Sequence, residues 1–345
     1  MSKTIKNTFN KNLTFLNLLN AYKRSIKSKG NKKNVIKFSI NLETNITEII
    51  TALKSNKYKP SKYFSFTIYE PKERKILALP LKDRIVQQWY IEQFIKPYII
   101  PRLIDDTYAC IKNKGTHNAV KKIEYYMRIM KSKHREYYIL KCDIKKYFYS
   151  IDKNILYNIM KCYISDKKLL NLTKILINES NEEKGIPIGN YTSQYYANIY
   201  LSKLDYYIKQ ELKVKYYVRY MDDFCLLLKT KQECFLIKKK IEKYLMTHLK
   251  LELNSKSRYY KNNSGINFCG YKIYETHRLL RNICKKKIKR KIIKWNKDYS
   301  LGKLDYSNLL TCWNSFMSHT KHANSYNFRL KMKNLIIANN NLKIE

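Results

Sequence analysis

The stretch YYVRYMDDFCLLL, residues 216–228, places two apolar runs on either side of the acidic pair Asp222 and Asp223. Both runs consist largely of aromatic and aliphatic residues, which strands favour, so the pattern predicts a β-hairpin with two carboxylates at its tip. By itself, an Asp-Asp pair is more often a plain polar hairpin turn. A catalytic role for the pair therefore needs support from the rest of the sequence.

A second strand is predicted upstream of the hairpin, where residues 136–143 read EYYILKCD and end on Asp143. Its β-branched and aromatic residues are typical of a buried strand. If the strand and the hairpin are neighbours in one sheet, three carboxylates come together. Carboxylates on rigid backbone can hold two divalent cations about 4 Å apart, which is what nucleotidyl transfer requires. Aspartate oxygens suit the hard Mg²⁺ ion.

The segments around these strands follow helical and strand patterns. Residues 1–60 are polar and lysine-rich, with apolar residues at helical spacing, which predicts short helices. Residues 63–81 are strand-like apart from the basic stretch PKERK, and residues 83–98 have the amphipathic pattern of a helix. Residues 194–212 also follow a helical pattern. Past His277 the composition turns strongly basic, so we expect a boundary near residue 275 with helices beyond it.

The composition favours a folded protein with a polyanionic partner. Seventy Lys and Arg against 27 Asp and Glu give a formal net charge of +43, to which an AT-rich coding bias contributes. Apolar residues make up 44% of the 345 residues, enough for a buried core. The eight cysteines form no CxxC pair and no long apolar segment is present. We therefore expect a soluble, cytoplasmic protein without a disulfide framework.

Seven ordered motifs resemble those of reverse transcriptases. They are RKILALPLKDR at 74–84, DTYACIKNKGTHNAV at 106–120, DIKKYFYSI at 143–151, GIPIGNYTSQ at 185–194, YMDD at 220–223, LELNSKS at 251–257 and INFCGYKI at 266–273. YMDD resembles the YxDD catalytic box of the family, and the last motif resembles its primer grip. Together the motifs span roughly residues 60–330, so the resemblance is not confined to one short match.

The resemblance implies an α+β fold, the right-hand polymerase, with an antiparallel sheet in the palm. The expected domains are an N-terminal helical extension at 1–60, the fingers and palm catalytic domain at 61–275, and a basic helical thumb at 276–345. The family attaches a primer 3′-hydroxyl to the α-phosphate of a deoxynucleotide on an RNA template.

The resemblance also assigns the catalytic metal site. Two Mg²⁺ ions, for which Mn²⁺ can substitute, are expected on Asp143, Asp222 and Asp223 and on the main chain of Ile144. The three aspartates are the expected catalytic residues. Phe148, five positions after the first aspartate, matches the aromatic residue that packs against the sugar and excludes a 2′-hydroxyl.

The remaining motif positions are expected to bind substrates. Lys75 competes with its neighbours for the triphosphate, and Lys256, which matches a proton donor for pyrophosphate, is equally typical of a solvated lysine. The residues expected to bind the nucleotide are Lys72, Arg74, Lys112, Tyr147, Phe148, Ile188, Gly189, Gln194 and Lys256. The primer grip is expected at Phe268, Cys269, Gly270 and Tyr271. The residues expected on the template-primer duplex are Arg278, Arg281, Lys285, Lys289, His319 and His322.

The thumb contacts rest mainly on residues 277–295, HRLLRNICKKKIKRKIIKW, which predict a basic helix able to lie along a phosphate backbone. Cys312, His319 and His322 are of the residue types that bind zinc. A structural zinc site needs four ligands, however, and no fourth lies nearby in the sequence. The two histidines are better explained as part of the thumb.

Ile188 points to a subclass within the family. Group II intron and retroviral enzymes have Gln where this chain has Ile188, and their motif does not end in Ser193-Gln194. These features, with ANIYLSKLD at 197–205, HRLLR at 277–281 and SHTKHAN at 318–324, resemble the enzymes of diversity-generating retroelements. Because an aliphatic side chain cannot supply the polar contact of Gln, we expect error-prone synthesis, concentrated opposite template adenines.

The resemblance implies several partners and leaves two alternatives open. Template RNA, the RNA/DNA duplex, deoxynucleotides and a small basic oligomeric accessory protein are expected, and a membrane is not. One alternative is a defence-associated reverse transcriptase that blocks phage, which neighbouring genes would distinguish. The other is a non-catalytic RNA-binding protein on a polymerase fold. The intact Asp143, Asp222 and Asp223 argue against this second alternative.

Overall fold

The computed structural model describes residues 4–69, 73–180 and 182–340, which form two compact units. The first unit comprises the chain up to Ile111, Asp143–Lys213 and Lys238–Lys256. The second comprises Lys112–Cys142, Val214–Ile237 and the chain from Ser257 onwards. Each unit is therefore assembled from segments that are distant in the sequence.

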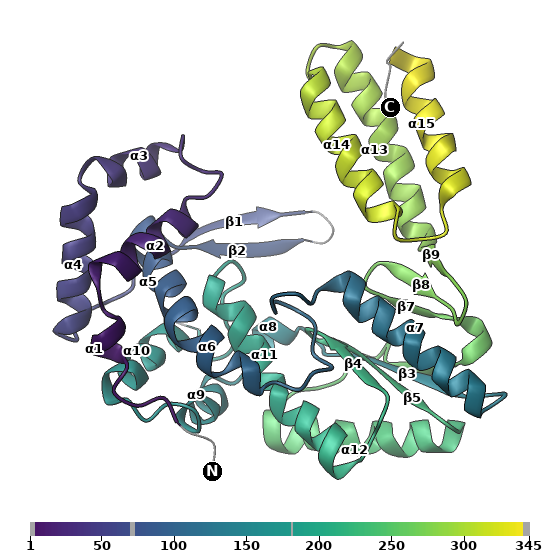
Figure 1. The fold of residues 1–345 in the computed structure, drawn as a ribbon, viewed down its shortest axis with the longest axis horizontal. Coiled ribbons are helices and arrows are strands. Elements are labelled where there is room, and N and C mark those ends of the chain that lie inside the picture. Colours follow the sequence, from purple (N-terminus) through teal and green to yellow (C-terminus); the bar gives the residue numbers. More distant parts are fainter. Residues whose placement is uncertain (1–3, 70–72, 181, 341–345) are drawn as a thin grey trace. The chain divides into compact units, whose positions relative to one another are not determined.

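The first unit is mainly helical (Figure 1). Its elements are α1 (Phe9–Asn12), α2 (Phe15–Ser25), α3 (Lys33–Ile40), α4 (Leu42–Lys54), β1 (Phe64–Ile68), β2 (Arg74–Ala78), α5 (Leu81–Tyr90), η1 (Ile91–Ile95), α6 (Lys96–Tyr98), η2 (Ile100–Arg102), α8 (Tyr147–Ser150), α9 (Lys153–Lys161), α10 (Lys167–Ile177), α11 (Tyr191–Tyr206) and η3 (Tyr207–Glu211). Strands β1 and β2 pair in antiparallel fashion and form a hairpin that extends away from these helices.

Aromatic side chains build the core of this unit. Trp89 and Phe94 are fully buried and meet edge to face, with ring centroids 5.2 Å apart. Phe9 from the N-terminal segment contacts both rings. Tyr90 packs against Tyr196 of α11. Such rings bury large apolar areas in fixed geometry, so they hold α5 and α11 firmly against each other.

The second unit contains the main sheets. Its elements are α7 (Thr116–Lys133), β3 (Tyr138–Asp143), β4 (Tyr217–Tyr220), β5 (Asp223–Leu228), β6 (Arg258–Lys261), η4 (Asn262–Ser264), β7 (Ile266–Phe268), β8 (Tyr271–Ile273), β9 (Arg278–Leu280), α13 (Asn282–Ser300), α14 (Tyr306–Thr320) and α15 (Tyr326–Asn340). Helix α12 (Lys231–Leu249) begins in this unit and ends in the first.

One sheet has the strand order β4-β5-β3-β6, and α7 packs against β4 and β5. The pairs β4 with β5 and β3 with β6 are antiparallel. The hydrophobic runs predicted for these strands are buried, as a sheet covered by a helix requires. In this order, the strand that ends on Asp143 is the neighbour of the strand that begins on Asp223. A second antiparallel sheet has the order β7-β8-β9.

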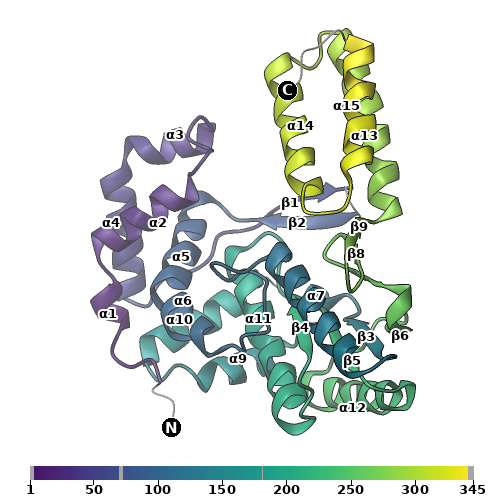
Figure 2. The same ribbon diagram turned by 45° about the vertical axis from the view of Figure 1, so that its right-hand side comes forward.

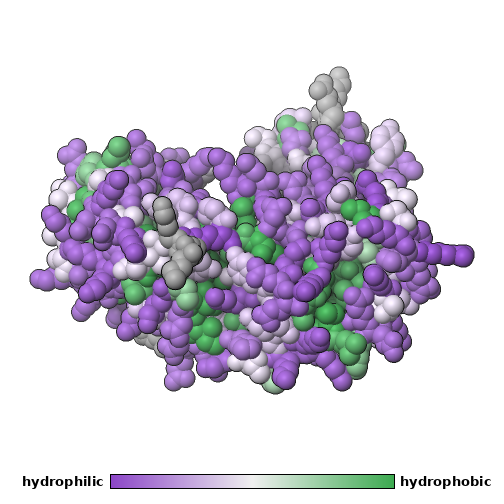
Figure 3. All heavy atoms as spheres, turned by 60° about the horizontal axis from the view of Figure 1, so that its bottom comes forward, coloured by the Kyte–Doolittle hydropathy of each residue, from purple (hydrophilic) through white to green (hydrophobic). Residues whose placement is uncertain are grey.

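Three helices at the C-terminal end, α13, α14 and α15, pack side by side (Figures 1 and 2). Their apolar core consists of Ile292, Trp313, Phe316, Met332 and Ile336. Lysine and arginine side chains on the outside of α13 are largely exposed. On the face shown in Figure 3, hydrophilic residues cover most of the surface, and apolar residues form separate patches.

The structure confirms the α+β class with antiparallel sheets and the predicted hairpin around Asp222 and Asp223. The predicted helix at 277–295 is wrong at its start, because β9 occupies Arg278–Leu280 and α13 begins only at Asn282. The cause is that β9 pairs with β8, a tertiary contact that the basic pattern does not reveal. The three-domain division stays a prediction. Within the described ranges, no helix has the length and apolar character needed to cross a membrane.

The core of the three C-terminal helices depends strongly on Trp313, which is 1% exposed. Replacing Trp313 with Ala removes a large buried ring, and we expect a loss of about 3–5 kcal/mol in the free energy of unfolding of this part. Urea denaturation followed by circular dichroism measures the change. The exposed Leu330 of α15, replaced with Ala, is the control. A loss in the Trp313 variant no larger than in the control would contradict the described packing.

Candidate active site

Asp143 is half-buried at the end of β3, and the loop after α12 holds both its side chain and its main chain. The Asn254 amide donates from Nδ2 to Asp143 Oδ2 at 3.1 Å. The Asn254 N–H donates to the Asp143 carbonyl at 2.7 Å. Next to it, Ile144 forms an antiparallel bridge with Leu253. These bonds restrict the orientation of the carboxylate, which a metal ligand requires.

The tip of the β4–β5 hairpin is a two-residue turn formed by Met221 and Asp222, since Tyr220 pairs directly with Asp223. Met221 has a φ of +59°, in the left-handed region that residues other than glycine rarely adopt. Arg219 is fully buried and donates from Nη1 to the Met221 carbonyl at 2.9 Å. The hydrogen bond stabilises a strained turn beside two acidic residues, as is common at functional sites.

Lys141, two residues before the end of β3, forms an ion pair with Asp223, with Nζ 2.9 Å from Oδ2. The same ammonium donates to the Asn267 carbonyl of β7 and lies 5.7 Å from the centre of the Phe268 ring. Burial by itself would lower the pKa of Lys141, but the charge of Asp223 raises it above the ordinary value. The lysine therefore stays charged and joins an acidic residue of the hairpin to the strand expected to hold the primer.

In the first unit, α8 and the loop at residues 185–190 are joined through their main chains. The Gly185 N–H donates to the Ile151 carbonyl and the Ile186 N–H to the Phe148 carbonyl, each at 2.8 Å. Phe148 is half-buried, whereas Tyr147 is buried and donates to the Ala197 carbonyl of α11. Phe148 and the loop that carries Ile188 are thus held next to each other.

The hairpin β1–β2 contacts the same loop. The Leu77 N–H donates to the Ile188 carbonyl at 2.9 Å. Gly189 has a φ of +125°, and a Cβ there would lie 2.5 Å from the Leu77 carbonyl oxygen. Only glycine permits this approach. The structure therefore brings together Phe148, Ile188 and Gly189, all predicted to contact the nucleotide.

The other residues predicted to bind the nucleotide are mostly exposed. Lys72 lies outside the described residues. Arg74 and Lys75 begin β2 and are exposed, and Lys112 is exposed on the loop before α7. Gln194 is exposed in the first turn of α11, and its Oε1 accepts from Cys110 Sγ at 3.3 Å.

Lys256 is exposed two residues after Asn254, and its N–H donates to Asn254 Oδ1 at 3.1 Å. This hydrogen bond fixes the main chain of the loop at Lys256. The ammonium group of Lys256 extends from a loop whose other end contacts Asp143.

The predicted primer grip is the hairpin between β7 and β8. Phe268 pairs with Tyr271, and both are buried. Cys269 and Gly270 form the turn with φ values of +46° and +90°, which is typical of a tight two-residue hairpin. The Tyr271 hydroxyl donates to the His319 carbonyl at 2.8 Å, and the two rings stack 4.9 Å apart. The hairpin is therefore fixed to the end of α14.

The residues predicted to contact the template-primer duplex have different surroundings. Arg278 forms an ion pair with Glu124 of α7, 2.6 Å from Nη2 to Oε2, and both side chains are largely buried. His322 is exposed and stacks on His117, with ring centroids 3.7 Å apart.

The basic residues at the start of α13 are partly or fully exposed. Arg281 precedes the helix and is half-buried, Lys285 lies 5.9 Å from the Phe328 ring, and Lys289 is exposed. Among the predicted thumb residues, Lys289 and Arg281 are thus better placed for a phosphate than Arg278, whose guanidinium is held by Glu124.

Sequence reasoning missed Asn254 and Lys141 as parts of the site. Asn254 lies inside the LELNSKS motif, and Lys141 lies two positions before Asp143, so both belong to segments that the sequence already singles out. A polar side chain close in sequence to an expected metal ligand is the feature that could have identified Lys141. What each one contacts depends on which strands become neighbours, and the sequence pattern does not state this.

Within the described ranges, no group of three or more His, Cys, Asp or Glu side chains is arranged to hold a metal ion. Magnesium in nucleotide enzymes is usually held by one or two carboxylates together with substrate phosphates and water, so a complete protein cage is not required. The acidic oxygens of Asp143, Asp222 and Asp223 are hard donors that fit such an ion.

The comparisons with known proteins identify the family. Residues 59–273 match the family model described as "Reverse transcriptase (RNA-dependent DNA polymerase)". The chain belongs to this family, whose members are nucleotidyltransferases that use divalent metal ions and bind template RNA. The right-hand polymerase is therefore the fold of this chain. No curated protein matches the sequence.

Solved telomerase structures match part of this chain. The apo telomerase of Candida tropicalis, truncated from its C-terminal domain, is 14% identical with a TM-score of 0.47, and the match covers 67% of this chain and 58% of that one. Telomerase of Candida albicans, in complex with a TWJ fragment of telomeric RNA, is 12% identical with a TM-score of 0.49, covering 83% and 61%. This chain thus spans about three fifths of each telomerase chain.

The ion pair between Lys141 and Asp223 yields a prediction. Replacing Lys141 with Met leaves a partly buried carboxylate without its cation, so we expect kcat for primer extension to fall at least about tenfold. Lys141→Arg keeps the charge and should restore part of the activity. Lys261→Met in neighbouring β6 removes an exposed pair with Glu136 and is the matched control. Equal activities of Lys141→Met and the control would contradict the role of Lys141.

Proposed function

We propose that this protein is an RNA-directed DNA polymerase that makes cDNA on an RNA template, with Asp143, Asp222 and Asp223 as its catalytic residues. The match of residues 59–273 to the reverse transcriptase family carries the proposal, because this range contains all three aspartates. The order of the main sheet supports it. Strand β3, which ends on Asp143, is hydrogen-bonded to β5, which begins on Asp223.

The metal ions of this reaction are proposed to be two Mg²⁺ ions, with Mn²⁺ as a substitute. When bound, they supply activation of the primer 3′-hydroxyl and neutralisation of the triphosphate. Asp143 and the Ile144 main chain on one strand, and Asp222 and Asp223 on the hairpin, would hold them. Asn254 orients the carboxylate of Asp143, and Lys141 orients that of Asp223. These contacts limit how far the two acidic side chains move when charge develops during the reaction.

The nucleotide is proposed to bind beside α8 and the loop at residues 185–190. Phe148 would exclude a 2′-hydroxyl and select deoxynucleotides. The exposed Arg74 and Lys112 would contact the triphosphate, where fixed positive charge stabilises negative charge on the transferring oxygens. Lys256 is the proposed proton donor to pyrophosphate. Each role follows from its position in a family motif.

The template-primer duplex is proposed to lie against the β7–β8 hairpin and the basic helix α13. A formal net charge of +43 favours a polyanionic partner, and binding should weaken steeply with added salt. The stacking of Tyr271 on His319 supports this proposal, since it fixes the primer-grip hairpin to the helices expected to hold the duplex.

The subclass proposed is that of diversity-generating retroelements. The motif GIPIGN with Ile188, and the segments around residues 197, 277 and 318, support it. Such an enzyme would act in the cytoplasm on a dedicated template RNA, with a small basic oligomeric accessory protein. Ile188 lies on a loop whose main chain is bonded to β2, so the main chain that carries this aliphatic side chain is held in place.

Primer extension tests the proposed activity. We expect the purified protein to extend oligo(dT) on poly(rA) with dTTP when Mg²⁺ is present and not after chelation with EDTA. Asp222→Asn removes one carboxylate charge and should lower the rate by at least about a hundredfold. Extension that persists unchanged in Asp222→Asn would show that these carboxylates do not catalyse the reaction.

Sequencing of cDNA tests the cause proposed for low fidelity. Ile188→Gln introduces a polar side chain into the loop, and we expect the error frequency opposite template adenines to fall several-fold, because polar contacts discriminate more strongly than apolar ones. Ile188→Leu keeps the aliphatic character and serves as the control. If both variants make errors as often as the natural sequence, Ile188 is not the cause.

A further inference from the structure

Glu179, two residues after the end of α10, has a carboxyl group that joins three separate segments of the first unit. Its Oε2 accepts hydrogen bonds from the Tyr63 hydroxyl at 3.1 Å, from Gln87 Nε2 at 2.8 Å and from Asn190 Nδ2 at 2.8 Å. Tyr63 directly precedes β1, Gln87 lies in α5, and Asn190 directly precedes α11. A single oxygen thus accepts from three donors that are distant in the sequence.

The donors are also bonded to one another and to the start of α11. Asn190 Nδ2 donates to the Tyr63 hydroxyl at 2.6 Å. The Tyr191 N–H donates to Gln87 Oε1 at 3.1 Å. Gln87 and Asn190 are both buried. Removal of the shared acceptor would leave buried donors unsatisfied, which costs more than a hydrogen bond at the surface.

The network lies next to the loop proposed to contact the nucleotide. Asn190 directly follows Gly189, the residue that approaches the Leu77 carbonyl, and Ile188 accepts from the Leu77 N–H. Tyr63 is the first residue before the hairpin to which Leu77 belongs. Glu179 therefore holds the far end of the loop and the base of the hairpin in the same network.

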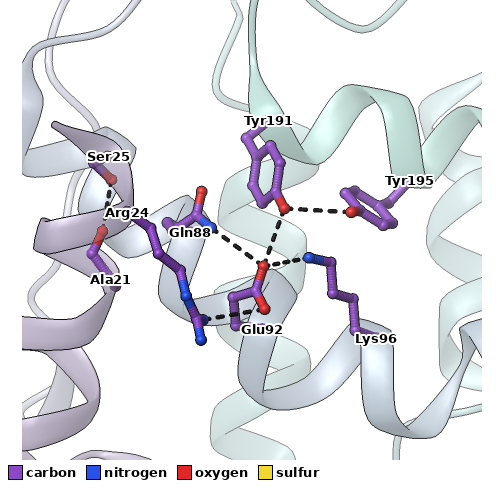
Figure 4. A network of polar contacts seen from close by, with 8 residues as sticks. All are labelled: Ala21, Arg24, Ser25, Gln88, Glu92, Lys96, Tyr191 and Tyr195. Carbon is purple, nitrogen blue, oxygen red and sulfur yellow. Dashed lines mark hydrogen bonds and ion pairs between the residues drawn. The ribbon is translucent and has the colours of Figure 1, made fainter. Parts of the chain in front are cut away.

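Glu92, a second acidic residue that is bonded to the start of α11, differs from Glu179 in the charge of its partners. Glu92 in η1 accepts from the Tyr191 hydroxyl at 3.0 Å and from Gln88, and it is paired with two cations, Arg24 and Lys96 (Figure 4). The three donors of Glu179, in contrast, are all neutral. The Oε1 atom of Glu179 is buried and has no hydrogen-bond partner within the described part of the chain.

We propose that Glu179 is a positioning residue that sets the affinity for the incoming deoxynucleotide by holding Asn190 and Tyr63, and with them the loop and the hairpin. This role rests on the polymerase function proposed above. Glu179 itself does not touch the substrate. No motif of the sequence contains it, and its effect passes through the main chain of Ile188 and Gly189.

The protonation of Glu179 gives the network a dependence on pH. Burial raises the pKa of Glu179 to about 8, the hydrogen bonds from Tyr63 and Gln87 oppose this shift, and the charge of Asp83 adds to it. Tyr58, which donates to Asp83, and Tyr196 are the other titratable groups facing this region. The pKa of Glu179 in the folded protein lies above the ordinary value of 4.5, so the protonated form stabilises the folded state. This contribution to folding stability is complete below pH 4.5 and is lost as the pH rises through about 8.

Steady-state primer extension on poly(rA) tests the role of Glu179. Glu179→Met has a similar size but no acceptor, and we expect the KM for dTTP to rise about tenfold with kcat within about threefold. Glu179→Gln keeps an acceptor oxygen without a charge and should restore the KM. Asp166→Asn is the matched control, since Asp166 caps the other end of α10 by accepting from the Leu169 N–H, and it also joins distant segments by accepting from the N–H groups of Thr8 and Phe9.

The pH profile of the KM tests the link between the network and nucleotide affinity. Between pH 7 and pH 9, Glu179 gains a negative charge that its burial opposes, so the KM for dTTP of the natural sequence should rise, and that of Glu179→Gln should stay constant. An unchanged KM in Glu179→Met, or a fall in kcat alone, would overturn the proposal. So would a rise in KM for Asp166→Asn equal to that of Glu179→Met. Absence of any extension by the natural sequence would instead contradict the polymerase function.

Discussion

The structure depends on holding negative charge in place on rigid backbone. Carboxylates that are meant to share cations repel one another without them, so each needs neighbours that restrain it. Asn254 bonds both the side chain and the main chain of Asp143, Lys141 is paired with Asp223, and Arg219 fixes the turn at Met221. These contacts do not add another acidic group. They supply hydrogen-bond donors and positive charge beside the acidic residues, which offsets the repulsion between the carboxylates and keeps them in a fixed arrangement.

In the first unit, hydrogen bonds likewise restrain the loop that is proposed to contact the nucleotide. The loop at residues 185–190 is fixed through main-chain bonds to α8 and β2, and through Asn190 to Glu179. Gly189 is needed because the Leu77 carbonyl leaves no room for a Cβ. A loop restrained in this way can present Ile188 to a base pair in a constant position. The proposed roles in nucleotide selection and fidelity both depend on this loop.

Much of the fold was predictable because the strands around Asp143 and Asp222 are short apolar runs and the helices have regular periodicity. The hairpin and the N-terminal helices were confirmed by the structure. The strand at Arg278–Leu280 was missed, because three residues in a basic stretch carry no period and pair only through β8. Glu179, Asn254 and Lys141 were missed for a related reason. A single polar residue shows its importance only when tertiary structure supplies its partner.

Asp143 and the Asp222–Asp223 pair are proposed to share two divalent cations. The number of bound Mn²⁺ ions can be counted by electron paramagnetic resonance, in a complex with primer-template and a non-hydrolysable deoxynucleotide analogue. We expect two Mn²⁺ per chain, and weaker binding of at least one of them when either Asp143 or Asp222 is replaced with Asn. Two ions bound with unchanged affinity in the Asp143→Asn variant would contradict this proposal.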